Sequence, residues 1–213
     1  MAGRTKEEAE ATRVQIIDAA EHVFYAKGVS GASLAEVAQA AGVTRGAIYW
    51  HFENKVDLFN AMLDRIRLPL DEISRSSEDE NEPDPLGCLR DLLLQVLRRV
   101  ALDASVQRTV DILRLKCEYT GELQGLRERL KVLGIECDQR LAKALGNAVN
   151  KGQLPADLDC LRAATYLHAF IVGVESNWLM MENFDLAEQA AQVVDSSLDM
   201  LRYSPALRIK VEA

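Results

Sequence analysis

The chain has 213 residues, of which 48% are hydrophobic, and carries a net charge of −8. This length allows one large domain or two smaller ones with a substantial core. An acidic chain does not coat DNA by bulk electrostatics, and no apolar run in it approaches the ~20 residues that span a bilayer.

The N-terminus, MAGRTKEEAEATR, is charged and lacks the hydrophobic segment of a signal peptide. We therefore expect a cytoplasmic protein with no membrane contact. The first predicted helix covers this region and ends at Lys27-Gly28. Its apolar residues recur at helical spacing, at Ile16, Ile17, Ala20, Val23 and Phe24.

The segment from Ser33 to Phe52 predicts two short helices joined by a glycine turn. Ser33 suits an N-cap, and Glu36 three positions later completes a capping box. Gly42 suits the left-handed residue that ends the first helix, and Thr44 suits the N-cap of the second.

The outward face of the second short helix carries Arg45, Tyr49 and His51 and no acid. A guanidinium, a phenol and an imidazole on one helix face favour contact with a DNA major groove. This pattern indicates a helix-turn-helix over residues 33–52. The alternative is an ordinary helical hairpin in an all-α protein.

The flanking sequence favours the helix-turn-helix. Four stretches between the N-terminus and Phe59 matter most: RTKEEAEATR, TRVQIIDAAEHVF, GVSGASLAEVAQAAGVTRGAIYWHF and ENKVDLF. Together they resemble the DNA-binding domain of the TetR family of bacterial repressors. TRGAIYWHF after an RTKEEA-type start is most similar to the AcrR-like branch, whose members repress multidrug efflux genes. A weaker resemblance continues through CLRDLLLQVL, LKCEYTGEL and SLDMLRYSPALR.

For this helix-turn-helix we predict that Arg45 reads base edges while neighbouring residues line the groove or hold phosphates. Residues 1–55 contain six basic and seven acidic residues, so binding must depend on a few local contacts. The groove-lining set is Thr44, Gly46 and Trp50. The phosphate-contacting set is Tyr49, His51 and Lys55, with Ser33 at a helix N-terminus and an arm of Arg4 and Lys6.

A fourth helix is predicted to begin at Asn54, with an apolar stripe that reaches Ile73. Residues 56–73 of this helix are expected to connect a DNA-binding domain, residues 1–55, with a second domain, residues 74–213. Pro69 removes one backbone hydrogen bond, which favours a kink; the alternative is that it marks the helix end. Residues 74–85, SRSSEDENEPDP, have no apolar residue and are expected to form a solvated loop.

Five further helices complete the prediction. The first begins at Asp84-Pro85, and the other four cover residues 106–119, 122–151, 159–181 and 185–203. The helix 106–119 is expected to be buried on two sides. No strand candidate appears. The predicted fold is therefore all-α with about nine helices, an N-terminal helix-turn-helix domain and a C-terminal helical domain for ligand binding and dimerisation.

The last two helices are the best candidates for a homodimer interface. The helix 185–203 carries a continuous apolar stripe, and the preceding helix has small residues at Ala169, Gly173 and Asn177 that permit close approach. The alternative is that both stripes pack on their own domain. The TetR resemblance implies that this helix pair also serves a twofold partner, which gives the specificity that one short reading helix lacks.

A ligand-responsive repressor needs an effector pocket, and we predict one from polar groups that border apolar stripes. His168 and Glu175 share a face of one helix, and Asp111 and Arg114 flank another stripe. The alternatives are a core histidine with its own partner and a surface ion pair. The predicted set is Ile66, Arg67, Leu70, Leu92, Leu93, Val96, Val110, Asp111, Leu113, Arg114, Cys137, Leu141, Leu167, His168, Ile171, Val172 and Glu175.

The sequence gives no support for an enzyme, a metal site or a cofactor. None of the three histidines has catalytic or metal-ligand spacing to other residues, and no phosphate-binding glycine loop is present. The four cysteines are interpreted as small core residues, with a redox sensor as the alternative.

The predicted function is a repressor that binds palindromic operator DNA, controls a multidrug efflux operon and is released by a hydrophobic or amphipathic effector. The alternatives are a TetR-type regulator of a metabolic or signalling gene, and a helical adaptor without DNA binding.

Overall fold

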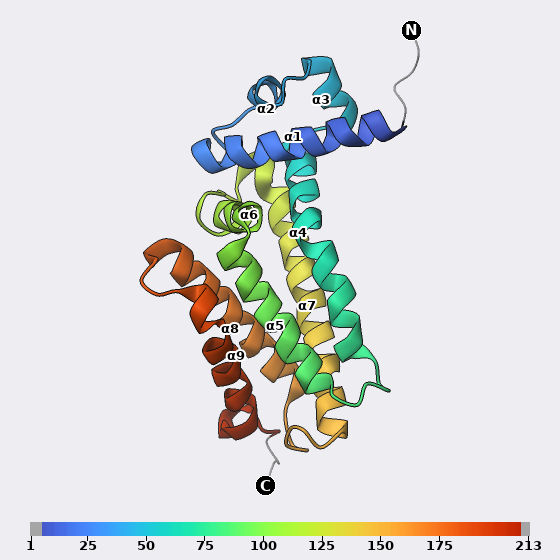
Figure 1. Cartoon of the computed structure of the whole chain (residues 1–213), viewed down its shortest axis with the longest axis vertical. Helices are drawn as coiled ribbons and strands as arrows, with labels where there is room; N and C mark the ends of the chain where they lie inside the picture. The colour runs from blue at the N-terminus through green and yellow to red at the C-terminus, as the bar shows by residue number, and fades with distance from the viewer. Residues whose placement is uncertain (1–5, 210–213) are drawn as a thin grey trace. The chain divides into compact units, whose positions relative to one another are not determined.

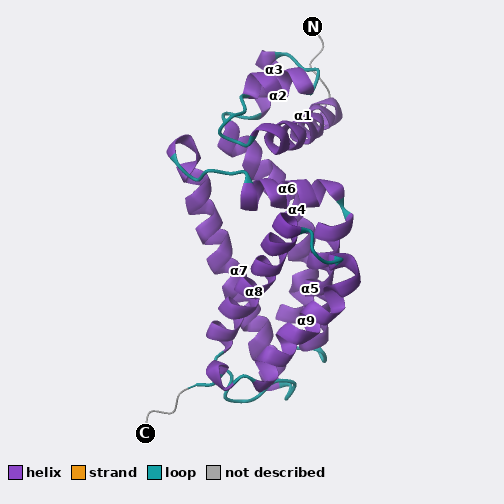
Figure 2. Cartoon of the chain, turned by 90° about the vertical axis from the view of Figure 1, so that its left-hand side faces the viewer, coloured by secondary structure: helices purple, strands orange, loops and turns teal. Residues whose placement is uncertain are grey.

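The computed structural model describes residues 6–209, apart from the side chains of Pro69, Glu72 and Ile73. Over these residues the chain is helical, and its only β-type pairing is an isolated bridge between Leu158 and Arg208 (Figures 1 and 2). The α-helices are α1 (Lys6–Lys27), α2 (Leu34–Ala40), α3 (Arg45–His51), α4 (Lys55–Glu78), α5 (Pro85–Leu102), α6 (Ala104–Leu115), α7 (Gln124–Asn150), α8 (Cys160–Met181) and α9 (Leu186–Tyr203).

The predicted all-α class is confirmed. Two short 3₁₀ segments, η1 (Gly121–Leu123) and η2 (Pro205–Leu207), add to the nine α-helices of the described residues. None of the helices described is both long enough and apolar enough to cross a bilayer.

The chain divides into two compact units that do not follow the chain order. The first, called here the reading unit, contains the residues up to 67 together with residues 104–129. The second, called here the core unit, contains residues 68–103 and the residues from 130 onward. The division falls inside α4 and α7, so each unit contains part of both helices. The domain limits at residues 55 and 73 remain a prediction.

The reading unit packs α1 against α2 and α6, and α2 against α3 (Figure 1). Its apolar centre contains Ile16 of α1, Ile48 of α3 and Met62 of α4, none of which is exposed. The rings of Phe24 in α1 and Phe59 in α4 lie with centroids 6.3 Å apart. The apolar stripe predicted for the first helix therefore forms the base on which the helix-turn-helix rests.

In the core unit, the buried faces of α5, α8 and α9 join residues of α7 in one hydrophobic cluster. Helix α5 packs along α9, and Arg90 of α5 forms a bidentate ion pair with Asp195 of α9 at 2.7 and 3.0 Å. The apolar stripe of α9, predicted as part of a dimer interface, belongs to this cluster: Leu186, Ala190, Val194, Ser197, Leu198 and Leu201 are buried within the protomer. The alternative assignment, packing on its own domain, is right for this stripe.

Two helix limits differ from the prediction. Helix α4 continues through Pro69 to Glu78, so Pro69 does not end it, and the predicted loop begins five residues too early. Ser74 and Ser77 are buried, and Ser77 donates its hydroxyl to the carbonyl of Ser74 while its own carbonyl accepts from Asn147 at 3.1 Å. Hydroxyls that bond inside the helix replace the apolar residues on which the prediction depended.

The second difference concerns α6, which ends at Leu115 instead of residue 119. Both predicted faces contain buried residues, Val110 on one and Ile112 on the other, whereas Leu115 at the end of the helix is 38% exposed. Tyr119 lies beyond the helix and donates its hydroxyl to the carbonyl of Leu113. The expected burial on two sides therefore holds for the body of α6, and the predicted end was wrong because residues 116–123 leave the helix and form a separate connection to α7.

Candidate functional site

The helix-turn-helix has the local geometry that the sequence predicts. Ser33 caps α2 in a complete capping box, accepting from the amide of Glu36 at 3.2 Å while its own amide donates to the Glu36 carboxylate at 2.8 Å. Gly42 has φ +63°, the left-handed conformation that ends α2. Thr44 accepts from the amide of Ala47 at 3.1 Å and caps α3.

The outer face of α3 is exposed. Trp50 is 72% and Tyr49 is 48% exposed, while Arg45 and Gly46 are exposed as well. On the opposite side, Ile48 is fully buried and anchors the helix. One face of α3 is therefore fixed by the core and the other is free to contact base edges, as a helix that reads the major groove requires.

Side chains of α3 also contact one another, among them the half-buried His51. The Arg45 guanidinium lies 5.8 Å from the centroid of the Tyr49 ring, a cation–π distance. The rings of Trp50 and His51 meet edge to face at 4.5 Å. These contacts restrict the rotamers of the predicted base-reading and phosphate-contacting groups before any partner arrives.

An acidic residue close to this surface is held in its charged form. Lys27 and Ser33 both bond to the carboxylate of Glu36, and together they lower its pKa to about 2. The carboxylate of Glu36 therefore takes part in the α2 cap and forms an ion pair with Lys27 at 2.5 Å.

Lys55 differs from its predicted role. Its side chain is only 11% exposed, and its ammonium donates to the carbonyls of Val29, Ser30 and Ala32 at 3.0, 3.3 and 2.9 Å. The same ammonium pairs with Glu122 at 2.5 Å. Since an ammonium has three N–H donors, this conformation leaves none for a phosphate, and the assignment of Lys55 to the phosphate-contacting set needs correction.

The predicted N-terminal arm is described only in part. Lys6 is the first residue of α1 and is exposed. Arg4 lies outside the described residues. The role of both residues toward DNA stays a prediction.

A charged cluster in the reading unit escaped the sequence analysis. Glu21 of α1 is 2% exposed, and its carboxylate accepts from Arg65 of α4 at 2.5 Å and from Arg108 of α6 at 2.6 Å. Ser105 donates to the same carboxylate at 2.5 Å. This Glu21 cluster joins three helices. Its sequence signal was present, because position 21 falls on the buried stripe of α1, four residues after Ile17.

The predicted ligand-binding residues are distributed over both units. Eight of them belong to the hydrophobic cluster of the core unit or pack against it: Leu70, Leu92, Leu93, Val96, Cys137, Leu141, Leu167 and Ile171. Val172 of the same unit is half-buried. Glu175 is 6% exposed, which is unusual for a carboxylate on the inner face of α8. A buried acid among aliphatic side chains is the kind of group that orients a ligand in an apolar site.

His168 has a partner in its own unit. Its Nδ1 lies 2.7 Å from the carboxylate of Asp138, which also accepts from the Thr165 hydroxyl at 2.8 Å. The imidazole therefore links α8 to α7. This agrees with the alternative of a core histidine that has its own hydrogen-bond partner. Only its Nε2 remains for the predicted contact with ligand.

The other ligand-binding candidates lie in the reading unit. Asp111 is 8% exposed and pairs with Lys116 at 3.6 Å, whereas Arg114 is exposed. Val110 is buried, and the three remaining candidates are half-buried: Ile66, Arg67 and Leu113.

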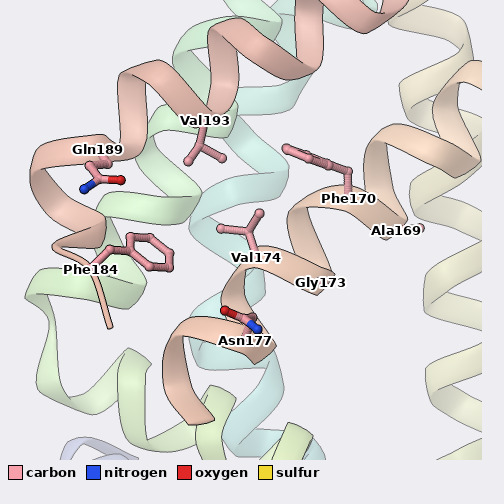
Figure 3. Close-up of a pocket in the computed structure, with 8 residues that line it drawn as sticks. All are labelled: Ala169, Phe170, Gly173, Val174, Asn177, Phe184, Gln189 and Val193. Atoms are coloured by element: carbon pink, nitrogen blue, oxygen red, sulfur yellow. The ribbon is translucent and has the colours of Figure 1, made fainter. Parts of the chain in front are cut away.

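An open groove of about 410 Å³ lies between α8 and α9 in the core unit (Figure 3). Figure 3 shows Val174 and Val193 facing each other across it, with Phe184 at one end and Phe170 at the other. The indole of Trp178 donates to the carbonyl of Phe184 at 3.0 Å and holds the turn between the helices. The groove contains none of the predicted ligand-binding residues but all three small residues of α8 that were predicted for dimer contact: Ala169, Gly173 and Asn177.

The cysteines have the character of core residues. All four are half-buried and free, and burial is the main cause that raises the pKa of each thiol: Cys88, Cys117, Cys137 and Cys160. The pKa of Cys137 rises to about 11. A protonated thiol is a weak nucleophile, so these environments disfavour the alternative of a redox sensor.

Comparison with known proteins gives matches in both halves of the chain. Residues 16–62 match the family described as bacterial regulatory proteins of the tetR family. Residues 84–203 match the C-terminal region of the MAATS-type transcriptional repressors. The two matches together cover the reading helix, the hydrophobic cluster and the groove.

Individual relatives match over nearly their whole length. The HTH-type transcriptional regulator TtgR of Pseudomonas putida is 48% identical over 98% of this chain and 100% of its own. NalD, the secondary repressor of the MexAB-OprM multidrug efflux pump in Pseudomonas aeruginosa, is 34% identical over 92% of this chain and 99% of its own, with a TM-score of 0.83. The structure of SmeT, from Stenotrophomonas maltophilia, was solved in complex with triclosan. SmeT is 28% identical over 95% of this chain and 100% of its own, with a TM-score of 0.82.

Proposed function

Because this chain belongs to the TetR family of bacterial transcriptional regulators, we propose that it represses a multidrug efflux operon by binding a pseudo-palindromic operator as a homodimer. It is a transcriptional regulator and not an enzyme, like the relatives that it matches. A hydrophobic or amphipathic effector releases it from the operator. Operator binding requires that the protein acts in the cytoplasm.

The exposed face of α3 is the observation that carries this proposal. Arg45 reads base edges with its planar guanidinium, and Trp50, which is 72% exposed, lies in the groove beside it. Tyr49 and His51 hold phosphates, together with the N-terminus of α2 at Ser33. Few cations take part, which suits a chain whose net charge is −8 and gives a low affinity for unrelated DNA.

The homodimer forms through the outer face of α8. Exposed apolar and small residues recur there at helical spacing: Tyr166, Ala169, Phe170, Gly173, Asn177 and Met180. A contiguous apolar face on a protein surface is typical of an interface. Val193 of α9 extends this face across the groove (Figure 3).

Gly173→Leu tests the dimer. A Cβ at Gly173 meets no atom within 4 Å inside the protomer, so a side chain can leave the helix there without a backbone clash. We expect overpacking of the dimer contact and a shift towards monomer in sedimentation velocity at micromolar concentration. Gly125→Leu on α7, where a Cβ also has open space, is the control. An unchanged dimer in the Gly173 variant would place the interface elsewhere.

The effector binds among the apolar side chains of the core unit. NalD and SmeT repress multidrug efflux pumps, and SmeT binds triclosan, which supports an apolar ligand for this chain. Glu175 and His168 orient the ligand, since both are polar groups on the inner side of α8. Helix α4, with Pro69 near the boundary of the two units, carries the change to the reading unit.

Selection of bound duplexes from a random pool tests the proposal directly. We expect an inverted repeat whose half-sites lie about one helical turn, roughly 34–36 Å, apart. Failure to enrich any sequence, with the protein folded and dimeric, would favour the helical adaptor instead.

A further inference from the structure

The connection between α6 and α7, residues 116–123, contacts the residues that flank the helix-turn-helix. On one side, Glu122 in η1 pairs with the ammonium of Lys55 at 2.5 Å. That ammonium donates to the loop between α1 and α2, at the carbonyls of Val29, Ser30 and Ala32. The carboxylate of Glu122 is the charge that balances a lysine of which only 11% is exposed.

The start of the same connection contacts the other side of that loop. The carbonyl of Lys116 accepts from the amide of Val29 at 3.4 Å, and the ammonium of Lys116 lies 4.3 Å from the centroid of the Tyr25 ring in α1. The backbones are close at this point, because a Cβ at Gly28 would meet the carbonyl oxygen of Lys116 at 3.2 Å. Gly28 also has φ +71°, a conformation that other residues rarely adopt.

The connection is itself well fixed. Tyr119 donates its hydroxyl to the carbonyl of Leu113 in α6, and the side chain of Leu123 is fully buried. A displacement of the C-terminal end of α6 therefore moves Lys116 and Glu122 together with it.

The loop that these residues hold leads directly into the reading motif. Ala32 is followed by Ser33, the N-cap of α2, so the position of the loop determines where α2 begins and how α3 is presented. We propose that Glu122 and Lys55 are positioning residues for operator recognition: they clamp residues 28–32 to the α6–α7 connection and so couple the end of α6 to the helix-turn-helix through the first residue of α4, without the rest of that helix. The inference rests on the proposed operator binding.

The negative charge of Glu122 allows a test by the direction in which DNA affinity changes. Replacing Glu122 with glutamine removes a negative charge from the reading unit, and charge alone then strengthens binding to every DNA. If Glu122 holds the reading motif in place, the same replacement weakens binding to the operator. For the operator, loss of the charge strengthens binding and loss of the clamp weakens it. For unrelated DNA, neither change weakens binding.

The experiment compares Glu122→Gln with Glu118→Gln, an exposed acid on the same connection. Each full-length variant is titrated with the duplex selected by the wild type and with a scrambled duplex of equal length. We expect Glu122→Gln to weaken operator binding about threefold to tenfold without weakening binding to the scrambled duplex, while Glu118→Gln leaves their ratio unchanged. Equal behaviour of the two variants, or an equal loss on both duplexes in Glu122→Gln, overturns the clamp.

Lys55→Met separates a clamp from a phosphate contact. Loss of a phosphate contact makes the slope of log K against log salt less steep by about 0.9 for each half-site on both duplexes, whereas loss of a clamp lowers operator affinity and leaves the slope unchanged. A reduced slope in Lys55→Met contradicts the proposal and restores Lys55 to the phosphate-contacting set.

Hydrogen exchange gives a readout that needs no DNA. Glu122→Gln should speed exchange in a peptide covering residues 27–34, with no change in Glu118→Gln. Unchanged exchange in this peptide overturns the clamp even if the variant binds DNA poorly. If instead the wild type enriches no duplex while the exchange result holds, the proposed operator binding fails and the clamp stands as a structural contact.

Discussion

Both compact units of this protein have an apolar centre, and they differ in the contacts that join their helices. In the reading unit, three helices meet at one buried carboxylate, Glu21, which is fixed by two arginines and a serine. In the core unit, α5, α7, α8 and α9 share a continuous cluster of aliphatic side chains. Charged hydrogen bonds are directional and hold one geometry, whereas aliphatic packing is non-directional and tolerates rearrangement.

This difference fits the work that each unit performs in the proposed function. A reading helix has to keep its base-contacting side chains in one orientation, for which a fixed polar cluster is suited. An effector site for varied hydrophobic compounds has to repack around different shapes. The following variants break each kind of contact in turn.

Leu97→Ala breaks the aliphatic cluster and should have the largest effect on stability. Leu97 in α5 is inaccessible to solvent, and its truncation leaves a cavity that costs about 3 kcal/mol of unfolding free energy. Urea unfolding followed by circular dichroism, at fixed protein concentration, measures this loss. Leu102→Ala at the end of the same helix, where the side chain is 72% exposed, should change stability by less than about 0.5 kcal/mol. Comparable losses in both variants would mean that the cluster is not the stabilising element.

Glu21→Ala breaks the polar cluster of the reading unit. It leaves the guanidinium groups of Arg65 and Arg108 without the buried carboxylate, and because both are about 30% exposed we expect a loss of about 2 kcal/mol, below that for a fully buried pair. Hydrogen exchange of α1 amides reports the loss. Asp18→Ala removes the other carboxylate that Arg65 contacts, whose side chain is 55% exposed, and should cost at most about 0.5 kcal/mol. An equal cost for the two acids would contradict the role given to burial.

Arg45→Ala tests the reading surface and should leave stability unchanged, because the side chain is exposed. Loss of a bidentate base contact costs on the order of 1–3 kcal/mol per half-site and relaxes the preference at one base pair. Competition binding with single-base operator variants measures both effects. Arg127→Ala, an exposed arginine of the same unit, should not change base preference. Retained preference in the Arg45 variant would remove this residue from the base-reading set.

The smallest effect is expected from protonation of Glu36. Its pKa is about 2 in the folded protein against an ordinary value of 4.5, because Lys27 and Ser33 bond to the charged form. A lowered pKa means that the carboxylate stabilises the α2 cap above pH 4.5 and that this contribution disappears as the pH falls towards 2. Carboxyl chemical shifts measured against pH should give the low midpoint. A midpoint near the ordinary value would show that the capping box does not form in solution.

The features of the fold that could be predicted from the sequence are those set by hydrophobic periodicity and by helix capping. The all-α class, the capping box at Ser33 and the left-handed turn at Gly42 all follow from local rules, and the structure has each of them. Local rules failed at the end of α4, where the buried hydroxyls of Ser74 and Ser77 occupy positions in which a periodicity search counts only apolar residues.

The candidate site was harder to predict because its polar contacts join distant segments. Glu21 and Arg108 are far apart in the chain, and so are Lys55 and Glu122, so no spacing rule pairs them. The exposed face of α3 could be predicted, since a single helix defines it. The predicted effector residues form no such local motif, and the groove between α8 and α9 contains none of them.

The most direct test of the account is whether occupancy of the core unit controls the reading unit. The selected duplex, labelled with a fluorophore, is titrated with the protein at increasing triclosan concentrations, and triclosan binding is measured by calorimetry with and without the duplex. We predict that triclosan weakens operator binding at least tenfold and that the operator weakens triclosan binding by the same factor, as linkage requires. Triclosan that binds the protein and leaves operator affinity unchanged would contradict the account.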